Sequence, residues 1–130
     1  MSRSIQLILI VILILQIKHF LCDYVLQSEY QYSNKGKYGH PGGIIHAGLQ
    51  ALFTIVAFVV ITPSLAFGFA IIVGEFIAHY HIDWSKEQIL KRRHWVFPQA
   101  QFWWVFGADQ ALHEMTYLAI AALLAIGAGL

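Results

Sequence analysis

Residues 5–23 read IQLILIVILILQIKHFLCD, an apolar run that closes with a lysine, a histidine and an aspartate. A run of this kind is long enough to cross the hydrocarbon of a bilayer as a helix, which takes about 20 residues. His19 and Asp23 are four positions apart, so a helix places both side chains on one face. Ionisable side chains are costly in lipid and indicate a functional site. The stretch therefore predicts a membrane protein with a polar site inside it.

The composition of the whole chain supports this interpretation. Its 130 residues are 58% hydrophobic and 12% charged, with a mean hydropathy of +0.63. A soluble domain of this length cannot bury so much apolar surface in one core, so we expect the bilayer to act as its solvent. We expect one all-α domain, residues 1–130, folded as a bundle of four transmembrane helices. The expected helices are Ile5–Gln27, Gly43–Ile61, Leu65 to about Trp84, and Phe102–Ile126.

The distribution of basic residues predicts the orientation. Lys35 and Lys37 lie in the first expected loop, Lys86 and residues 91–93 lie in the third, and the opposite side has only Arg3. By the positive-inside rule, the first and third loops face the cytoplasm and both termini face away from it. The net charge of +1 does not favour a nucleic-acid partner.

All three aspartates of the chain are four residues from a histidine, inside the expected helices. The pairs are His19–Asp23, His79–Asp83 and Asp109–His113. At 1.5 Å of rise per residue, the three pairs and His46 fall within a few helical turns of the same interface. The first pair is repeated by the second sixty residues later, which suggests two helical hairpins related by a pseudo-twofold axis along the membrane normal.

Imidazole and carboxylate groups on facing helices are how helical bundles build metal sites. We therefore expect a site for divalent metal, with zinc favoured and manganese or iron as alternatives. The expected ligands are His19, Asp23, His46, His79, Asp83, Asp109 and His113. They exceed the four positions of one tetrahedral ion, so the site would hold either two ions or one ion with supporting partners. The alternative is that the pairs are structural contacts that hold the helices together.

Three further side chains have expected roles near this site. Glu75 lies one turn before His79 and is the expected general base, which would take a proton from a water that the ion makes acidic. Lys86 lies one turn from Asp83 and is expected to face a phosphoryl group. Lys18 is expected to extend its amine toward the membrane interface.

The ordered set His19-x3-Asp23, His46, His79-x3-Asp83-x2-Lys86 and Asp109-Gln110-x2-His113 resembles a bacterial and phage family of small membrane proteins catalogued as a domain of unknown function. The resemblance spans nearly the whole chain. That family is distantly similar to membrane-bound metal-dependent hydrolases. The resemblance therefore implies a hydrolase, and a protein of the bacterial inner membrane.

We expect the substrate to be a phospholipid or another phosphoester delivered by the lipid bilayer, and a homodimer would provide room for a cleft that four short helices lack. Two other functions remain open from the sequence. The same ligands could form the ion site or proton relay of a transporter or channel component, or they could stabilise a noncatalytic membrane module.

Overall fold

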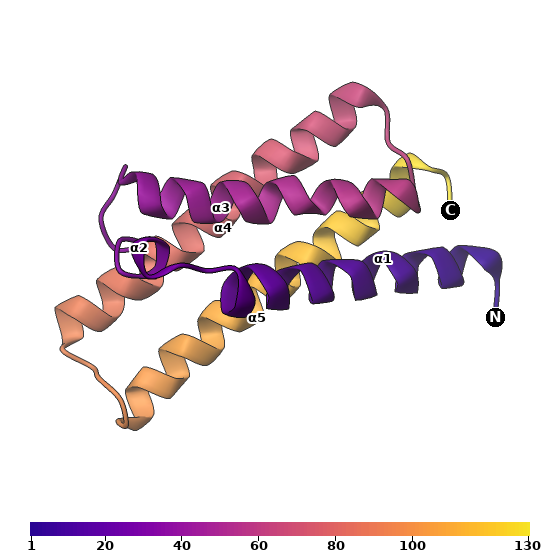
Figure 1. Ribbon diagram of the computed structural model, residues 1–130. Helices are drawn as coiled ribbons and strands as arrows, with labels where there is room; N and C mark the ends of the chain where they lie inside the picture. Colours follow the sequence, from indigo (N-terminus) through magenta and orange to yellow (C-terminus); the bar gives the residue numbers. More distant parts are fainter.

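The computed structural model describes all 130 residues and is entirely helical (Figure 1), which confirms the predicted all-α class. The five α-helices are α1 (Arg3–Phe20), α2 (Glu29–Tyr32), α3 (Pro41–Phe53), α4 (Leu65–Arg93) and α5 (Ala100–Gly127). A π-helical turn, η1 (Leu21–Val25), continues α1, and a 3-10 segment, η2 (Thr54–Val59), continues α3. With these extensions, four helical segments are long and apolar enough to cross a membrane, as predicted.

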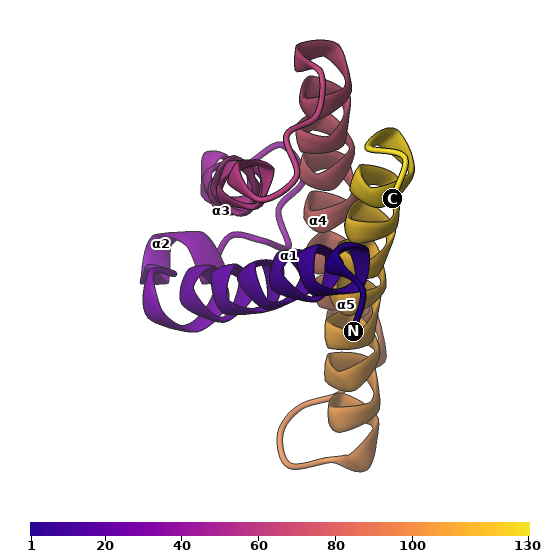
Figure 2. The same cartoon turned by 90° about the vertical axis from the view of Figure 1, so that its right-hand side faces the viewer.

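The four long segments form two antiparallel pairs that cross each other. In Figure 1, α1 runs against α3 and α4 runs against α5, and Figure 2 shows the first pair lying against one side of the second. The helices contact one another in chain order around the bundle: α1 with η2 and α3, α3 with α4, α4 with α5, and α5 with α1. Both hairpins are thus present, and the pseudo-twofold axis between them stays a prediction.

The two ends of the bundle differ in their connections. At one end, here the loop end, lie α2 with the first loop and the short connection between α4 and α5 (Figure 1). At the other end, the turn end, lie both chain termini and the connection between η2 and α4. Ser64 begins α4 there, and its hydroxyl accepts a hydrogen bond from the amide of Phe67 at 3.4 Å.

One helix boundary differs substantially from the sequence prediction. The third helix was expected to end near Trp84, but α4 continues to Arg93 and ends at His94, whose φ of 55° is left-handed. The added residues, SKEQILKRR, are mostly strong helix formers, so the helix runs on beyond the apolar span. Lys86 therefore lies on a helix rather than in a loop. The α-helix of the first span is shorter than expected because it changes to the π turn after Phe20.

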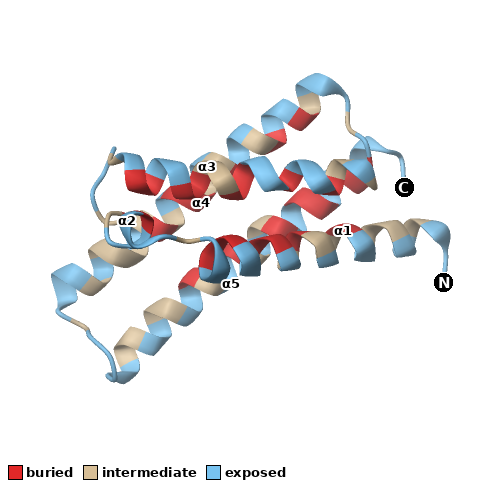
Figure 3. Ribbon diagram, viewed as in Figure 1, coloured by how far each residue is buried: buried red, intermediate tan, exposed pale blue.

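Burial separates a polar half from an apolar half of the bundle. Buried positions line the faces where the helices meet, and much of the outer surface is exposed (Figure 3). Large apolar side chains such as Leu13 and Leu52 are more than half exposed, which suits a surface that faces lipid. Toward the turn end, nine buried residues form a hydrophobic core: Val11, Leu15, Ala57, Ile61, Ile71, Tyr117, Ile120, Ala121 and Leu124.

Tyr117 allows a simple test of this packing. Its side chain is 1% exposed, and its hydroxyl has no hydrogen-bond partner. Because an unsatisfied buried hydroxyl is destabilising, Tyr117→Phe should leave the free energy of unfolding unchanged or raise it by about 1 kcal/mol. Unfolding in mixed detergent micelles measures this, with Tyr24→Phe on the exposed surface as the control. A clear loss of stability would show that the hydroxyl has a partner.

Candidate metal centre

The structure brings all seven predicted ligands into one buried group, here the His/Asp cluster. Every member is at most 7% exposed. The members are His19 in α1, Asp23 in η1, His46 in α3, His79 and Asp83 in α4, and Asp109 and His113 in α5. Each of the four long segments thus contributes at least one side chain, and the cluster lies toward the loop end. Such groups are stable away from water only when they have charged or hydrogen-bonding partners.

Four ligand atoms of the cluster face one another closely. His46 Nε2 lies 3.0 Å from His79 Nε2, 3.0 Å from Asp23 Oδ1 and 3.3 Å from Asp83 Oδ2. His79 Nε2 lies 3.8 Å from the same Asp23 oxygen and 3.4 Å from the same Asp83 oxygen. Bonds of about 2.0–2.2 Å to a tetrahedral zinc ion put neighbouring ligand atoms roughly 3.3 Å apart. We call these four atoms the first position; the five distances, 3.0–3.8 Å, lie on either side of that spacing.

Besides His79 Nδ1, three other atoms of the cluster lack any hydrogen-bond partner. His113 Nε2 lies 3.7 Å from Asp83 Oδ1 and 3.7 Å from Asp109 Oδ1. All three atoms are buried and unsatisfied. Almost every buried polar atom in a protein has a partner, so three orphans side by side require an explanation.

His19 connects the cluster to the protein surface. Its Nε2 lies 3.0 Å from Asp23 Oδ2, and its Nδ1 lies 3.6 Å from Glu114 Oε1. The Glu114 side chain is 40% exposed, and the amide of Gln16 donates a hydrogen bond to it. A continuous line of polar groups therefore runs from Asp23 outward.

The π-helical turn sets the position of Asp23. The amide of Leu26 donates to the carbonyl of Leu21 at 2.8 Å, which is the hydrogen bond of a π turn. Such a turn adds a residue to the helical repeat and so changes the direction of the side chains that follow, and it recurs at functional sites. Here Asp23 directs one oxygen toward His46 and the other toward His19.

Two lysines reach the cluster from the loop end. Lys35 Nζ, from the first loop, lies 3.0 Å from Asp83 Oδ2, and the Lys35 side chain is 6% exposed. Lys86 Nζ lies 3.9 Å from Asp83 Oδ1 and 3.9 Å from Asp109 Oδ2. Two ammonium groups thus offset two of the three aspartate charges, and the cluster retains one net negative charge when its imidazoles are neutral.

Three sets of residues within the cluster have ligand atoms close enough to share a metal ion. They are His19 with Asp23 and His113, Asp23 with His46 and His79, and His79 with Asp83 and His113. Asp109 belongs to none of these sets.

Residues 8–128 match the model of the family described as "Protein of unknown function (DUF3307)". The chain belongs to the DUF3307 family. No curated protein and no solved structure matches the chain significantly. The resemblance to a family of unknown function is confirmed. Because the DUF3307 description names no reaction, function has to be argued from the geometry of the site.

Sequence reasoning missed Lys35, whose ammonium group contacts the cluster at Asp83. The first loop that carries it packs on α4: Gln88 Nε2 donates to the Gly36 carbonyl at 2.7 Å, and a Cβ at Gly36 would lie 3.1 Å from Glu87 Cβ. The glycine thus permits the close approach that buries Lys35. No sequence signal identifies this contact, because loop residues have no periodicity and the lysine also serves as a topology signal.

Glu75 and Lys18 pair with each other instead of taking their predicted surroundings. The prediction that Lys18 extends to the interface is wrong. The residue is only 5% exposed, and its side chain turns inward and forms an ion pair with Glu75 Oε1. Lys18 Nζ also donates to the carbonyl of Gln50 at 3.1 Å. This pairing gives the Lys18 ammonium group an opposite charge inside the bundle, so the side chain does not have to extend to the interface. Glu75 lies outside the three metal-binding sets, and its role as general base stays a prediction.

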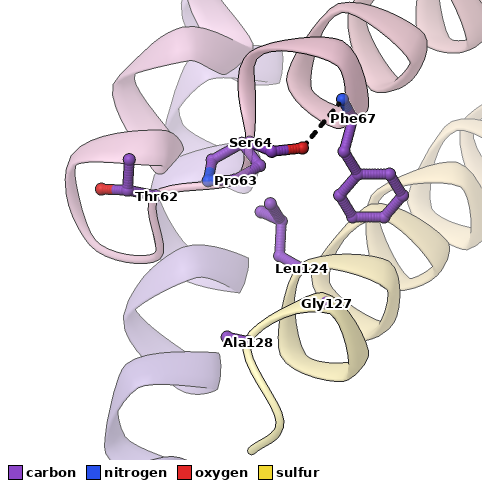
Figure 4. A pocket seen from close by; sticks show the side chains of 7 residues that line it. All are labelled: Thr62, Pro63, Ser64, Phe67, Leu124, Gly127 and Ala128. Atoms are coloured by element: carbon purple, nitrogen blue, oxygen red, sulfur yellow. Dashed lines mark hydrogen bonds between the residues drawn. The ribbon is translucent and has the colours of Figure 1, made fainter.

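A pocket of about 260 Å³ lies elsewhere, at the turn end. It is lined by Thr62, Pro63, Ser64, Phe67, Leu124, Gly127 and Ala128 (Figure 4). None of these residues was predicted for the site, and none carries a titratable side chain. This pocket therefore offers no acid, no base and no charged metal ligand.

Proposed function

We propose that this DUF3307 protein is a membrane-embedded, metal-dependent hydrolase whose metal occupies the first position. One observation carries the proposal: two imidazole nitrogens and two carboxylate oxygens converge from three helical segments at 3.0–3.8 Å. Two carboxylates neutralise a divalent ion, and two imidazoles complete a tetrahedral set of the kind that zinc accepts. Manganese or iron are the alternatives.

Asp23, His46, His79 and Asp83 would hold the ion. When bound, it would supply Lewis-acid activation and make a water nucleophilic near neutral pH. The protein groups supply the rest. His19 fixes Asp23 through their 3.0 Å contact, as outer partners fix metal ligands.

His19 is also the group that we favour for passing a proton outward. Its Nε2–H would give a proton toward Asp23's side of the cluster or receive one there only as its Nδ1 exchanges a proton with Glu114, whose side chain is 40% exposed, so the ring lies between the cluster and the surface. Glu75, the acceptor expected from the sequence, is bound by Lys18. The surroundings of the two groups thus favour His19.

The substrate that we propose is a phosphoester, in the first place a phospholipid reached from the bilayer. Lys35 and Lys86 support this choice, because they place two ammonium groups beside Asp83 at the loop end. A cationic pair next to a divalent ion suits an anionic group in which negative charge develops during reaction.

The hydrophobic core argues against the alternative of a transporter or channel. Eight of its nine residues are aliphatic, and the ninth is Tyr117. Together they fill the half of the bundle toward the turn end. An ion or proton path would need polar groups through this half. The only buried polar side chains there, the hydroxyls of Thr54 and Tyr117, do not form such a path.

We propose that the protein lies in the bacterial inner membrane with its loop end in the cytoplasm. The distribution of basic residues supports this orientation, because six of the eight lie at the loop end. They are Lys35, Lys37, Lys86, Lys91, Arg92 and Arg93. Labelling of a cysteine placed at Ser33 in a Cys22→Ala background tests this, since a reagent that cannot cross the membrane should not reach it in intact cells.

Activity is tested with purified protein in lipid nanodiscs. We expect turnover of an aryl phosphodiester or a phospholipid that requires a divalent ion, and a fall of at least about 100-fold in His46→Ala, which removes a ligand. His81→Ala is the matched control, because His81 lies on α4 but is exposed and contacts Tyr38 instead of the cluster. Metal-independent turnover, or no turnover of any phosphoester by the metal-loaded protein, would contradict the proposal.

A further inference from the structure

Besides His79 Nδ1, the unsatisfied atoms of the cluster form one set of three, here the orphan set. His113 Nε2 faces Asp83 Oδ1 and Asp109 Oδ1, each at 3.7 Å, and the residues are 1–3% exposed. None of the three atoms accepts or donates a hydrogen bond. Two carboxylate oxygens and an imidazole nitrogen buried together without a donor are the usual ligands of a divalent cation.

Asp83 links this set to the first position. Its Oδ2 faces His46 and His79 at 3.3 and 3.4 Å, and its Oδ1 faces the orphan set. A carboxylate with one oxygen in each of two ligand sets is the arrangement by which paired metals share a ligand, and such pairs clamp the attacking and leaving oxygens of a phosphoryl transfer.

The cation nearest to the orphan set, Lys86, has a closer partner outside it. Lys86 Nζ is 3.9 Å from Asp83 Oδ1, too far for a hydrogen bond, and it lies closer to Glu87 Oε1, at 3.2 Å. The Glu87 side chain is 35% exposed. The lysine therefore has an outward partner and does not block the set.

We propose that His113, Asp83 and Asp109 form a second divalent-metal position, bridged to the first by the Asp83 carboxylate. This inference rests on the proposed function, because a bridged pair requires an ion at the first position. It assigns a role as metal ligand to Asp109, which the three metal-binding sets leave out.

The experiment measures bound metal rather than turnover. Purified protein in nanodiscs is saturated with Mn²⁺, freed of excess ion, and assayed for manganese per chain and for spin coupling by electron paramagnetic resonance. We expect two ions and a coupled signal in the wild type. Asp109→Asn and His113→Gln should each reduce the content to one ion and give an uncoupled signal.

Two variants serve as controls. Glu29→Gln on the exposed part of α2 should retain two ions and the coupled signal. His46→Ala should lose the ion of the first position and the coupling. Circular dichroism establishes that each variant is helical.

The outcomes separate this inference from the proposed function. One ion in the wild type, or two coupled ions in both Asp109→Asn and His113→Gln, would overturn the second position. One ion with metal-dependent turnover would leave the hydrolase proposal standing. Two coupled ions without turnover would support the paired site and contradict the hydrolase. No bound metal at all would overturn both.

Discussion

Protein carrying Asp83→Asn should bind divalent ions at least about 100-fold more weakly than the wild type. Loss of an outer partner of a metal ligand already costs about 10–100-fold in affinity, and Asp83 offers its two oxygens directly to both ligand sets. The amide keeps the shape of the side chain but removes its charge. Competition with a fluorescent zinc chelator in nanodiscs measures the affinity.

The same variant distinguishes a metal site from a structural contact. If the cluster only holds the helices together, Asp83→Asn should lower stability in the absence of metal and leave metal affinity unchanged. If the cluster is a metal site, the wild type should be stabilised by added zinc and the variant should not, because a ligand that binds only the folded state raises its stability. Wild-type affinity in the variant would rule out Asp83 as a ligand.

Lys18→Met should destabilise the protein by about 3–5 kcal/mol. The substitution leaves the Glu75 carboxylate buried without its partner, and Glu75 is 2% exposed. A buried ion pair contributes little net stability, but removing one member leaves an uncompensated charge. Unfolding by a denaturing detergent, followed by circular dichroism, gives the free energy.

The double substitution Lys18→Met with Glu75→Leu is the matched control. Because it removes both charges, it should recover most of the stability that Lys18→Met alone loses. Lys37→Met provides a second control, since Lys37 pairs only with Asn34 in an exposed loop. A double variant no more stable than the single one would show that Lys18 acts through its contact with the Gln50 carbonyl or the Tyr117 ring.

The helices and the ligand residues could be predicted because both have a regular spacing. Apolar runs of sufficient length define the four segments, and the spacing of four in pairs such as His79–Asp83 fixes one helix face. Placing the pairs at one depth then required only the rise of a helix. The structure brings these residues together, while metal binding itself stays a proposal.

The remaining features depend on contacts between segments distant in sequence. Lys35 enters the cluster because Gly36 packs on α4, and Lys18 turns inward because Glu75 lies opposite it on another helix. The π turn around Asp23 has no local signature that the apolar pattern could reveal. Periodicity says which face of a helix is polar, but it does not say which side chain of another helix will meet that face.

The unequal halves of the bundle have an electrical consequence. Asp23 is two residues from the end of its span at Val25, and His46 is five residues from the start of its own at Pro41. A membrane potential falls mainly across the apolar part of a membrane protein, which here is the half that holds the aliphatic core. Moving one charge through the full potential involves about 2.3 kcal/mol per 100 mV. Charges that enter or leave a cluster so near one face cross little of that field, so its occupancy should be nearly the same in energised and de-energised membranes.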